Sequence, residues 1–160
     1  MQIAIIGGGA AGFAAAVAAA ETGALVTVLE RNQKPLKKLG VAGNGRGNIL
    51  NAGEPAYYGD AAFALSALRR VGYRELTAFF KSLGVPLRQE SEGRVYPASL
   101  QASAVQDALL LRARQLGVAV RCLARAERIE KERDGFVIHG QQGFPDGAKT
   151  PAEEPFTLRA

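Results

Sequence analysis

The sequence predicts an α/β fold in which three parallel strands form a sheet and an antiparallel pair of strands follows. The first observation is the order of the first elements. Apolar runs at residues 2–6 and 25–30 enclose an Ala-rich, helix-favouring stretch at residues 10–21. A strand, a helix and a strand in succession imply a right-handed crossover and parallel pairing. The second observation is the turn-forming pair Asp134-Gly135 between two strand-like runs, which predicts a hairpin.

Composition agrees with one globular domain and locates the excess charge. The chain has 160 residues, of which 48% are apolar and 22% charged, and this excludes a disordered or collagen-like chain. It carries 20 Lys and Arg against 15 Asp and Glu. Residues 31–53 contain five basic residues and no acidic one, so the rest of the chain has equal numbers of each sign. The net charge of +5 therefore belongs to one segment.

The single cysteine, Cys122, and the single histidine, His139, limit the chemistry of the chain. They exclude a disulfide framework and a Cys- or His-based metal cluster within it, so we expect no metal site. One cysteine also fits a reducing compartment, and we expect a cytoplasmic protein. Residues 3–20 carry no charge, but their Ala and Gly content and the lack of a basic start argue against a membrane span or a signal peptide.

The middle of the chain predicts a long loop followed by two helices. Residues 31–59 are rich in Gly, Asn and Pro and lack periodicity, and a loop of this length in a compact domain usually has a function. Helices are predicted at residues 60–71 and 73–83. The apolar residues of the second helix recur on one face, which we expect to pack against a core.

The last third of the chain predicts the third parallel strand and the hairpin. Residues 93–97 favour a short strand or turn, and Ser99 is the expected N-cap of a helix that ends at Gly117. The third parallel strand is predicted at residues 118–122. The remaining segments are the hairpin strands at 125–133 and 136–139, an exposed loop at 141–154 and the start of a strand at 156–160. These strands are few for such a domain, so we expect the first part of a longer protein.

Three glycines after the first strand match the fingerprint of a dinucleotide-binding loop. They are Gly7, Gly9 and Gly12, in the spacing Gly-x-Gly-x-x-Gly between a strand and a helix. Gly7 permits the tight turn, Gly9 allows a pyrophosphate to approach the backbone, and Gly12 lets helix and strand pack closely. The helix N-terminus then faces the phosphates. A chance glycine pattern in a buried helix is the alternative interpretation.

Glu30 ends the second strand, 18 residues after Gly12. In this position a carboxylate accepts hydrogen bonds from the hydroxyl groups of a ribose. Its negative charge disfavours a ribose that carries a phosphate. Arg31 follows it and leaves that alternative open.

The basic segment contains a second glycine-rich loop, with glycines at positions 40, 43, 45 and 47. Such a backbone can approach a flat ligand. Asn44 and Asn48 offer amide donors and acceptors, and Arg46 offers a fixed fork of donors. A solvated surface loop is the alternative interpretation.

The chain resembles the N-terminal part of a bacterial flavoprotein family, the aminoacetone oxidase family FAD-binding enzymes, also called BaiN-type or NAD(P)/FAD-dependent oxidoreductases. The resemblance covers nearly the whole chain. It rests on the glycine motif, Glu30, the Lys-Lys-Leu…Gly-Asn-Gly-Arg-Gly-Asn…Asn loop of residues 37–51 and the Gly-Arg-Val-Tyr-Pro-Ala-Ser segment of residues 93–99. It implies that residues 1–160 are the N-terminal part of a Rossmann-like FAD-binding domain. The substrate insert and the C-terminal part of the family fold would lie outside this chain.

The resemblance implies FAD as cofactor and a flavin-dependent oxidoreductase as the full-length protein, with this segment inactive alone. The substrate would be a small molecule, and NAD(P)H or oxygen the second partner. The implied FAD contacts are Gly7, Gly9, Ala11 and Gly12 at the pyrophosphate, Glu30 at the adenosine ribose, Arg31 near the adenosine half, Asn44, Gly45 and Arg46 near the cofactor, and the backbone of Ala126 at the adenine.

The loop departs from the family pattern, which usually reads Ser-Gly…Gly-Arg-Cys-Asn-x-Thr-Asn. Ala42, Gly47 and Leu50 stand here in place of the Ser, Cys and Thr. The missing thiol argues against cysteine–flavin chemistry in this protein.

Two other functions remain open from the residues alone. The glycine fingerprint also fits an NAD-dependent dehydrogenase, against which the Asn- and Arg-rich loop argues. The basic segment 31–53 also fits a nucleic-acid-binding module. That segment lacks the interleaved aromatic residues on which bases stack, so we expect no nucleic-acid partner.

No catalytic residue is predicted, because the sequence shows no set of nucleophile, base and orienting residue. In flavoenzymes the flavin ring carries the redox step, and the protein mainly positions it. Arg94, Tyr96 and Ser99 are candidates to line the site, but packing is the preferred role for Tyr96 and capping for Ser99. His139 has no acidic partner nearby in sequence, and we expect an ordinary surface residue.

Overall fold

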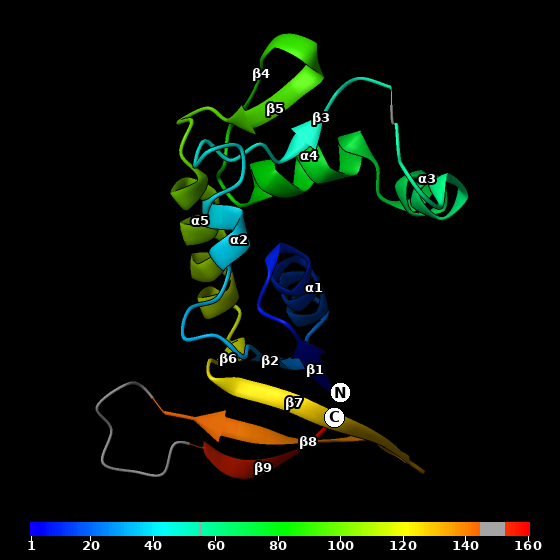
Figure 1. Ribbon diagram of the computed structural model, residues 1–160, viewed down its shortest axis with the longest axis vertical. Coiled ribbons are helices and arrows are strands. Elements are labelled where there is room, and N and C mark those ends of the chain that lie inside the picture. The colour runs from blue at the N-terminus through cyan, green and yellow to red at the C-terminus, as the bar shows by residue number, and fades with distance from the viewer. Residues whose placement is uncertain (55, 145–152) are drawn as a thin grey trace. The chain divides into compact units, whose positions relative to one another are not determined.

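The computed structural model describes residues 1–54, 56–144 and 153–160. The chain divides into two compact units (Figure 1). The first unit consists of residues 1–37 and 109–160, and the second of residues 38–108.

The first unit contains the predicted parallel sheet, in the order β1-β2-β6. Its strands are β1 (Gln2–Ile6), β2 (Leu25–Leu29) and β6 (Ala119–Arg121), and both pairings are parallel. Among the described residues, β1 and β6 are therefore the edges of this sheet. The three predicted parallel strands are confirmed.

Helix α1 (Ala10–Glu21) connects β1 to β2 and packs on the sheet. Its buried residues recur at the spacing of one helix face and are Phe13, Ala16, Val17 and Ala20. Gly23 follows the C-cap of the helix, has a φ of 84° and donates its N–H to the carbonyl of Ala20. The left-handed conformation there favours glycine, so the helix stop follows from the sequence.

A second sheet in the first unit is antiparallel, in the order β7-β8-β9. Its strands are β7 (Ala124–Glu132), β8 (Gly135–Gly143) and β9 (Glu153–Arg159). The predicted hairpin at Asp134-Gly135 is confirmed. The loop predicted at residues 141–154 is wrong at both ends, because residues 141–143 pair with residues 153–155. Local composition did not reveal these pairings, and residues 145–152 lie outside the described residues.

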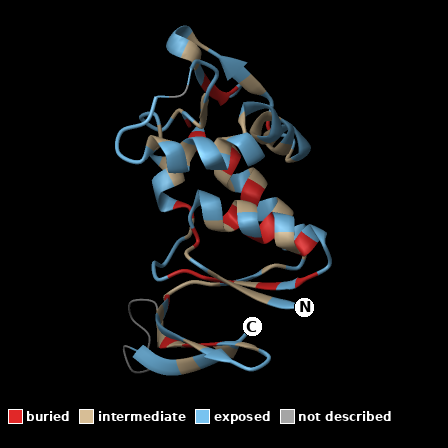
Figure 2. Cartoon of the chain, turned by 90° about the vertical axis from the view of Figure 1, so that its right-hand side faces the viewer, coloured by how far each residue is buried: buried red, intermediate tan, exposed pale blue. Residues whose placement is uncertain are grey.

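The parallel sheet lies between α1 on one side and the antiparallel sheet on the other (Figure 1). The buried residues Leu29, Ala124 and Ile138 form a cluster between the two sheets, and Phe156 and Leu158 pack against it. Burying a side chain of the size of leucine contributes about 1.5–3 kcal/mol. Figure 2 shows this buried layer together with the buried face of α1.

The second unit contains a small antiparallel sheet in the order β3-β5-β4. Its elements are α2 (Lys37–Gly40), which begins at the unit boundary, β3 (Leu50–Asn51), α3 (Ala61–Arg70), α4 (Tyr73–Ser82), β4 (Leu87–Gln89), the 3₁₀ turn η1 (Ser91–Gly93), β5 (Arg94–Pro97) and the first half of α5 (Ala102–Gln115). The two predicted helices at 60–71 and 73–83 are confirmed as α3 and α4. The apolar face predicted for α4 is half-buried. Since α2 and β3 fall within residues 31–59, the loop prediction there was too long.

Ser99 is not the N-cap that the sequence predicted, because α5 begins at Ala102. The Ser99 hydroxyl instead accepts a hydrogen bond from the backbone N–H of Gln101, in the turn before the helix. Leu100 has a φ of 55°, which ends any helical path from Ser99. The helix stop at Gly117 is confirmed by its φ of 73° and by the hydrogen bond from the N–H of Val118 to the carbonyl of Ala113.

Candidate functional site

The glycine loop of the first unit has the close packing that its sequence predicts. Gly7 has a φ of 106°, and its N–H donates to the carbonyl of Leu29 at 2.8 Å. A Cβ on Gly12 would lie 1.9 Å from the carbonyl oxygen of Gly7, so only glycine fits where α1 passes β1. The positive φ at Gly7 and the close approach of the backbone at Gly12 therefore require glycine at both positions.

The outer side of this loop is open. A Cβ on Gly9 would meet no atom within 4 Å, and Gly9 and Ala11 are both exposed. Gly9 is the N-cap of α1 and provides no side chain to accept from the first amide groups of the helix. Exposed N–H groups at the positive end of a helix are suited to an anion such as a phosphate. The loop therefore fits the pyrophosphate of a dinucleotide, and the contacts predicted for Gly7, Gly9, Ala11 and Gly12 remain predictions.

The carboxylate of Glu30 is held beside the glycine loop. Glu30 is 7% exposed and is the buried charged residue among the described residues. One carboxylate oxygen accepts the backbone N–H of Gly8 at 2.8 Å. The other accepts both the backbone N–H and the side-chain amide of Asn32, at 2.7 and 2.6 Å. These hydrogen bonds offset the cost of burying the charge.

Gly8 and Asn32 are functional candidates that the sequence analysis missed. A Cβ on Gly8 would lie 2.9 Å from the Cβ of Glu30, so the middle one of three consecutive glycines allows the acid to approach the loop. The run of three glycines is a signal from which Gly8 was predictable. The contact of Asn32 depends on the path of the chain after β2, which its sequence does not specify.

Glu30 also connects the parallel sheet to the start of β7. Its N–H donates to the carbonyl of Arg121, and its carbonyl accepts the N–H of Ala124, both at 2.9 Å. Ala126 lies two residues further along β7, half-buried beside a β-bulge that follows it. Arg31 is exposed directly after Glu30. The first unit thus contains the predicted glycine, Glu30, Arg31 and Ala126 positions, and their contacts to a cofactor remain predictions.

The second glycine-rich loop lies in the second unit, with Asn44 and Gly45 exposed. The guanidinium of Arg46 pairs with the carboxylate of Glu90 at 2.6 Å. The same guanidinium lies 4.6 Å from the centre of the Tyr96 ring. Tyr96 is 5% exposed, so its predicted packing role is confirmed, and the Arg46 side chain lies against it.

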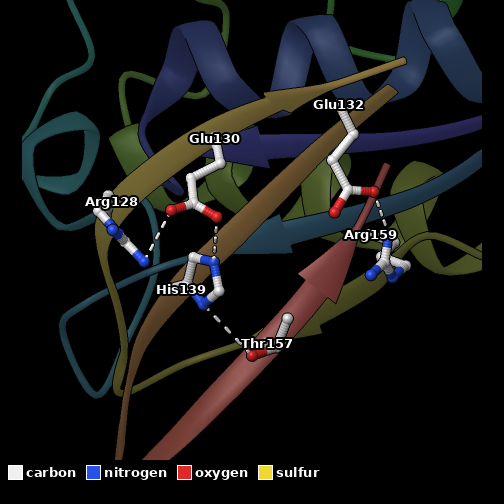
Figure 3. Close-up of polar contacts among 6 residues, drawn as sticks. All are labelled: Arg128, Glu130, Glu132, His139, Thr157 and Arg159. Atoms are coloured by element: carbon white, nitrogen blue, oxygen red, sulfur yellow. Dashed lines mark hydrogen bonds and ion pairs between the residues drawn. The ribbon is translucent and has the colours of Figure 1, made fainter. Parts of the chain in front are cut away.

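His139 has an acidic partner that the sequence analysis did not find (Figure 3). Its Nε2 lies 3.1 Å from Glu130 Oε2, and its Nδ1 lies 3.5 Å from the hydroxyl of Thr157. His139 pairs with Arg128 across the hairpin, which places Glu130 diagonally opposite. The imidazole therefore bridges β7, β8 and β9, and His139 is half-buried and paired where an ordinary surface residue was expected.

The Cys122 thiol is half-buried near Glu30. Burial raises the pKa of the Cys122 thiol, and the charge of Glu30 raises it further, so the thiolate is disfavoured.

Within residues 1–54, 56–144 and 153–160, no three His, Cys, Asp or Glu side chains gather as metal ligands would. No helix in the same ranges has the length and apolar character needed to cross a membrane.

Comparison with known proteins identifies a family match. The model of the HI0933-like protein Rossmann domain matches residues 1–147. The chain is also 38% identical over 157 residues to the 3-dehydro-bile acid delta(4,6)-reductase of Clostridium scindens. That alignment covers 95% of this chain and 37% of the relative, so the chain spans little more than a third of the relative's length.

Solved structures share the fold at low sequence identity. The 3-ketosteroid-delta4-(5alpha)-dehydrogenase of Rhodococcus jostii RHA1 matches with a TM-score of 0.64 and 17% identity, over 98% of this chain and 43% of that chain. THI4 of Thermovibrio ammonificans matches with a TM-score of 0.57 and 21% identity, over 86% of this chain and 46% of that chain. At these identities the likeness shows the α/β fold alone.

Proposed function

The chain belongs to the HI0933-like family of FAD-binding Rossmann domains, and we propose that it forms the FAD-binding segment of a flavin-dependent oxidoreductase. One observation carries this proposal. The open N-terminus of α1 follows the glycine loop, and the buried carboxylate of Glu30 is fixed beside that loop by the N–H of Gly8. An anion-binding helix end next to a fixed carboxylate is the arrangement that binds a pyrophosphate and its ribose.

The proposed contacts are those that the resemblance implies. The glycine loop takes the pyrophosphate, Glu30 accepts from the adenosine ribose, and Arg31 and the backbone of Ala126 contact the adenosine half. Asn44, Gly45 and Arg46 are proposed to approach the cofactor. When bound, FAD supplies the isoalloxazine ring that accepts or donates a hydride. The residues of this chain bind and orient it.

The activity of the whole protein is proposed from its relative. The reductase activity of this relative, at 38% identity, supports a BaiN-type reductase that acts on a small organic molecule. NAD(P)H is the proposed hydride donor, and the cytoplasm, with its reducing pool, the proposed location. Turnover of NAD(P)H by the purified full-length protein in the presence of a 3-dehydro-bile acid tests the activity. A protein that binds FAD but leaves this substrate unchanged would require another substrate class.

Cofactor binding is tested on the full-length protein by thermal unfolding with FAD, FMN or NAD. A ligand at 100 times its Kd raises the free energy of unfolding by about 2.7 kcal/mol, so FAD should raise the Tm by several degrees. FMN lacks the adenosine half and should have a smaller effect. A colourless protein whose Tm does not respond to FAD refutes the proposal, and a response to NAD alone favours a dehydrogenase.

A further inference from the structure

The loop of residues 43–47 has a backbone that is costly to hold in one conformation. Asn44 has a φ of 55°, and Gly43, Gly45 and Gly47 have φ values of 57°, 81° and 79°. Glycines lose the most conformational freedom on folding, and asparagine is one of the few other residues that adopt the left-handed region. Two local hydrogen bonds shape the turn, from the N–H of Arg46 to the carbonyl of Gly43 and from the N–H of Gly47 to the carbonyl of Ala42, and contacts from outside the loop restrict it further.

Backbone contacts hold the loop against the start of α5 and the end of β5. The carbonyl of Gly45 accepts the N–H of Ala102 at 2.8 Å. A Cβ on Gly47 would lie 3.1 Å from Ala102 Cα and 3.2 Å from Pro97 Cδ, so the backbone of the loop is pressed against both. These contacts fix the backbone of the residues before and after Arg46.

The side chain of Arg46 adds an anchor to a different part of the small sheet. Glu90, which follows β4, binds Arg46 at 2.6 Å through one carboxylate oxygen and Arg88 at 3.2 Å through the other. The ring of Tyr96, on β5, lies under the Arg46 guanidinium at 4.6 Å. A guanidinium that pairs with a carboxylate in its plane and a ring on its face is fixed in orientation as well as position.

The charge of Glu90 allows two possible roles of Arg46 in cofactor binding to be distinguished. Glu90 pairs with both Arg46 and Arg88, so it offsets only part of the charge of Arg46. Two properties of the guanidinium are therefore candidates to govern cofactor binding, its remaining charge and its fixed geometry. If free charge governed cofactor binding, removal of the Glu90 charge would strengthen it. If geometry governed binding, the same removal would weaken it. The two possibilities predict changes of opposite sign.

We propose that Glu90 and Tyr96 are positioning residues that hold Arg46, and through it the loop of residues 43–47, in the conformation that presents Asn44 and Gly45 to FAD. Neither residue needs to touch the cofactor. The inference rests on the proposed function, since it assigns a support to the cofactor loop.

The test measures the Kd for FAD of the full-length apoprotein by quenching of flavin fluorescence. Glu90→Gln keeps the size of the side chain and removes its charge, and it should weaken binding about tenfold, which corresponds to about 1.4 kcal/mol. Glu92→Gln is the matched control, because Glu92 lies two residues away and pairs with Arg94 at the surface. It should leave the Kd unchanged.

Tyr96 is tested by a pair of variants. Tyr96→Leu removes the ring and should weaken FAD binding, while Tyr96→Phe keeps the ring face and should restore most of the affinity. The visible circular dichroism of bound FAD reports its surroundings, and it should change in Glu90→Gln and Tyr96→Leu but not in Glu92→Gln. A purely structural role for Glu90 would alter the Tm and leave this spectrum as in the unaltered protein.

The outcomes separate the two proposals. If the unaltered protein binds no FAD, the proposed function fails, whatever the variants do. If it binds FAD and Glu90→Gln binds equally well or more tightly, the positioning role is refuted and the proposed function stands.

Discussion

The two glycine-rich loops of this protein are held in different ways. In the first unit, the loop of residues 7–12 is held through its backbone, since Gly12 packs against Gly7 and the backbone N–H of Gly8 donates to Glu30. In the second unit, the loop of residues 43–47 has backbone contacts as well, and the side chain of Arg46 adds contacts to Glu90 and Tyr96. The first loop thus rests on main-chain contacts, and the second rests in addition on the side chain of Arg46. Substitutions within the first loop should therefore change folding stability or FAD affinity directly. Substitutions at Glu90 or Tyr96 should change FAD affinity through their effect on the second loop.

The largest effect is expected for Gly12→Ala. The new methyl group would overlap the carbonyl oxygen of Gly7, so β1 and α1 would have to separate. We expect a loss of about 3 kcal/mol in the free energy of unfolding, the upper end of the range for overpacking. Urea denaturation followed by circular dichroism measures it. An unchanged urea midpoint would show that the loop is less tightly packed than its geometry indicates.

Gly9→Ala is the matched change in the same loop. Gly9 has a φ of −84°, which alanine adopts freely, and the added Cβ would meet no protein atom within 4 Å. The free energy of unfolding should change by less than about 0.5 kcal/mol. FAD binding should weaken tenfold or more, because the methyl group would occupy the space proposed for the pyrophosphate. Unaltered FAD affinity, measured by flavin fluorescence, would place the pyrophosphate elsewhere.

Asn32→Ala tests how firmly Glu30 is held. The substitution removes the side-chain amide that donates to the carboxylate at 2.6 Å and keeps the backbone N–H that donates at 2.7 Å. Loss of one hydrogen bond to a part-buried charge should cost about 1–2 kcal/mol of folding stability. Gln33→Ala, one residue further along the exposed chain, is the control. Equal stability of the two variants in urea would mean that the backbone amides suffice.

The smallest effect concerns Glu75 in the first turn of α4. Hydrogen bonds from its own backbone N–H and from that of Gly72 lower the pKa of this exposed carboxyl group. Because the folded pKa is the lower one, the contribution to stability is present above the usual pKa of glutamate and is lost as the pH falls through the folded value. Glu75→Gln should therefore flatten the loss of Tm between pH 5 and 3, about the pH range in which exposed glutamates titrate. An identical pH profile of Tm in both proteins would contradict this role.

The separation of partner residues along the sequence explains which elements could be predicted. The periodicity of residues 2–30 and the glycine spacing predicted β1, α1 and β2, because each depends on residues close in the chain. The pair Asp134-Gly135 predicted the hairpin for the same reason. By contrast, β3 has two residues and exists because they pair with Arg94 and Val95, more than 40 residues away. No local pattern encodes such a strand.

The candidate site follows the same division. Gly7, Gly9, Gly12 and Glu30 were predictable from spacing, and the packing of Gly12 and the burial of Glu30 agree with it. Glu90 was not predictable as a partner of Arg46, because 44 residues separate them. The Ser99 cap failed for a related reason, since the turn at Leu100 delays the start of α5 by two residues.

The position of β1 in its sheet has a consequence for the behaviour of the chain in solution. β1 leads into the glycine loop and, among the described residues, has β2 as its only hydrogen-bonded neighbour in the sheet. It carries no charge and no proline, and such an open strand is a template for the strand of another molecule. We therefore expect residues 1–160, studied alone, to self-associate through this strand. The apparent molar mass from light scattering should then rise with concentration for the 160-residue chain, and a lysine in place of the half-exposed Ile6 should reduce that rise.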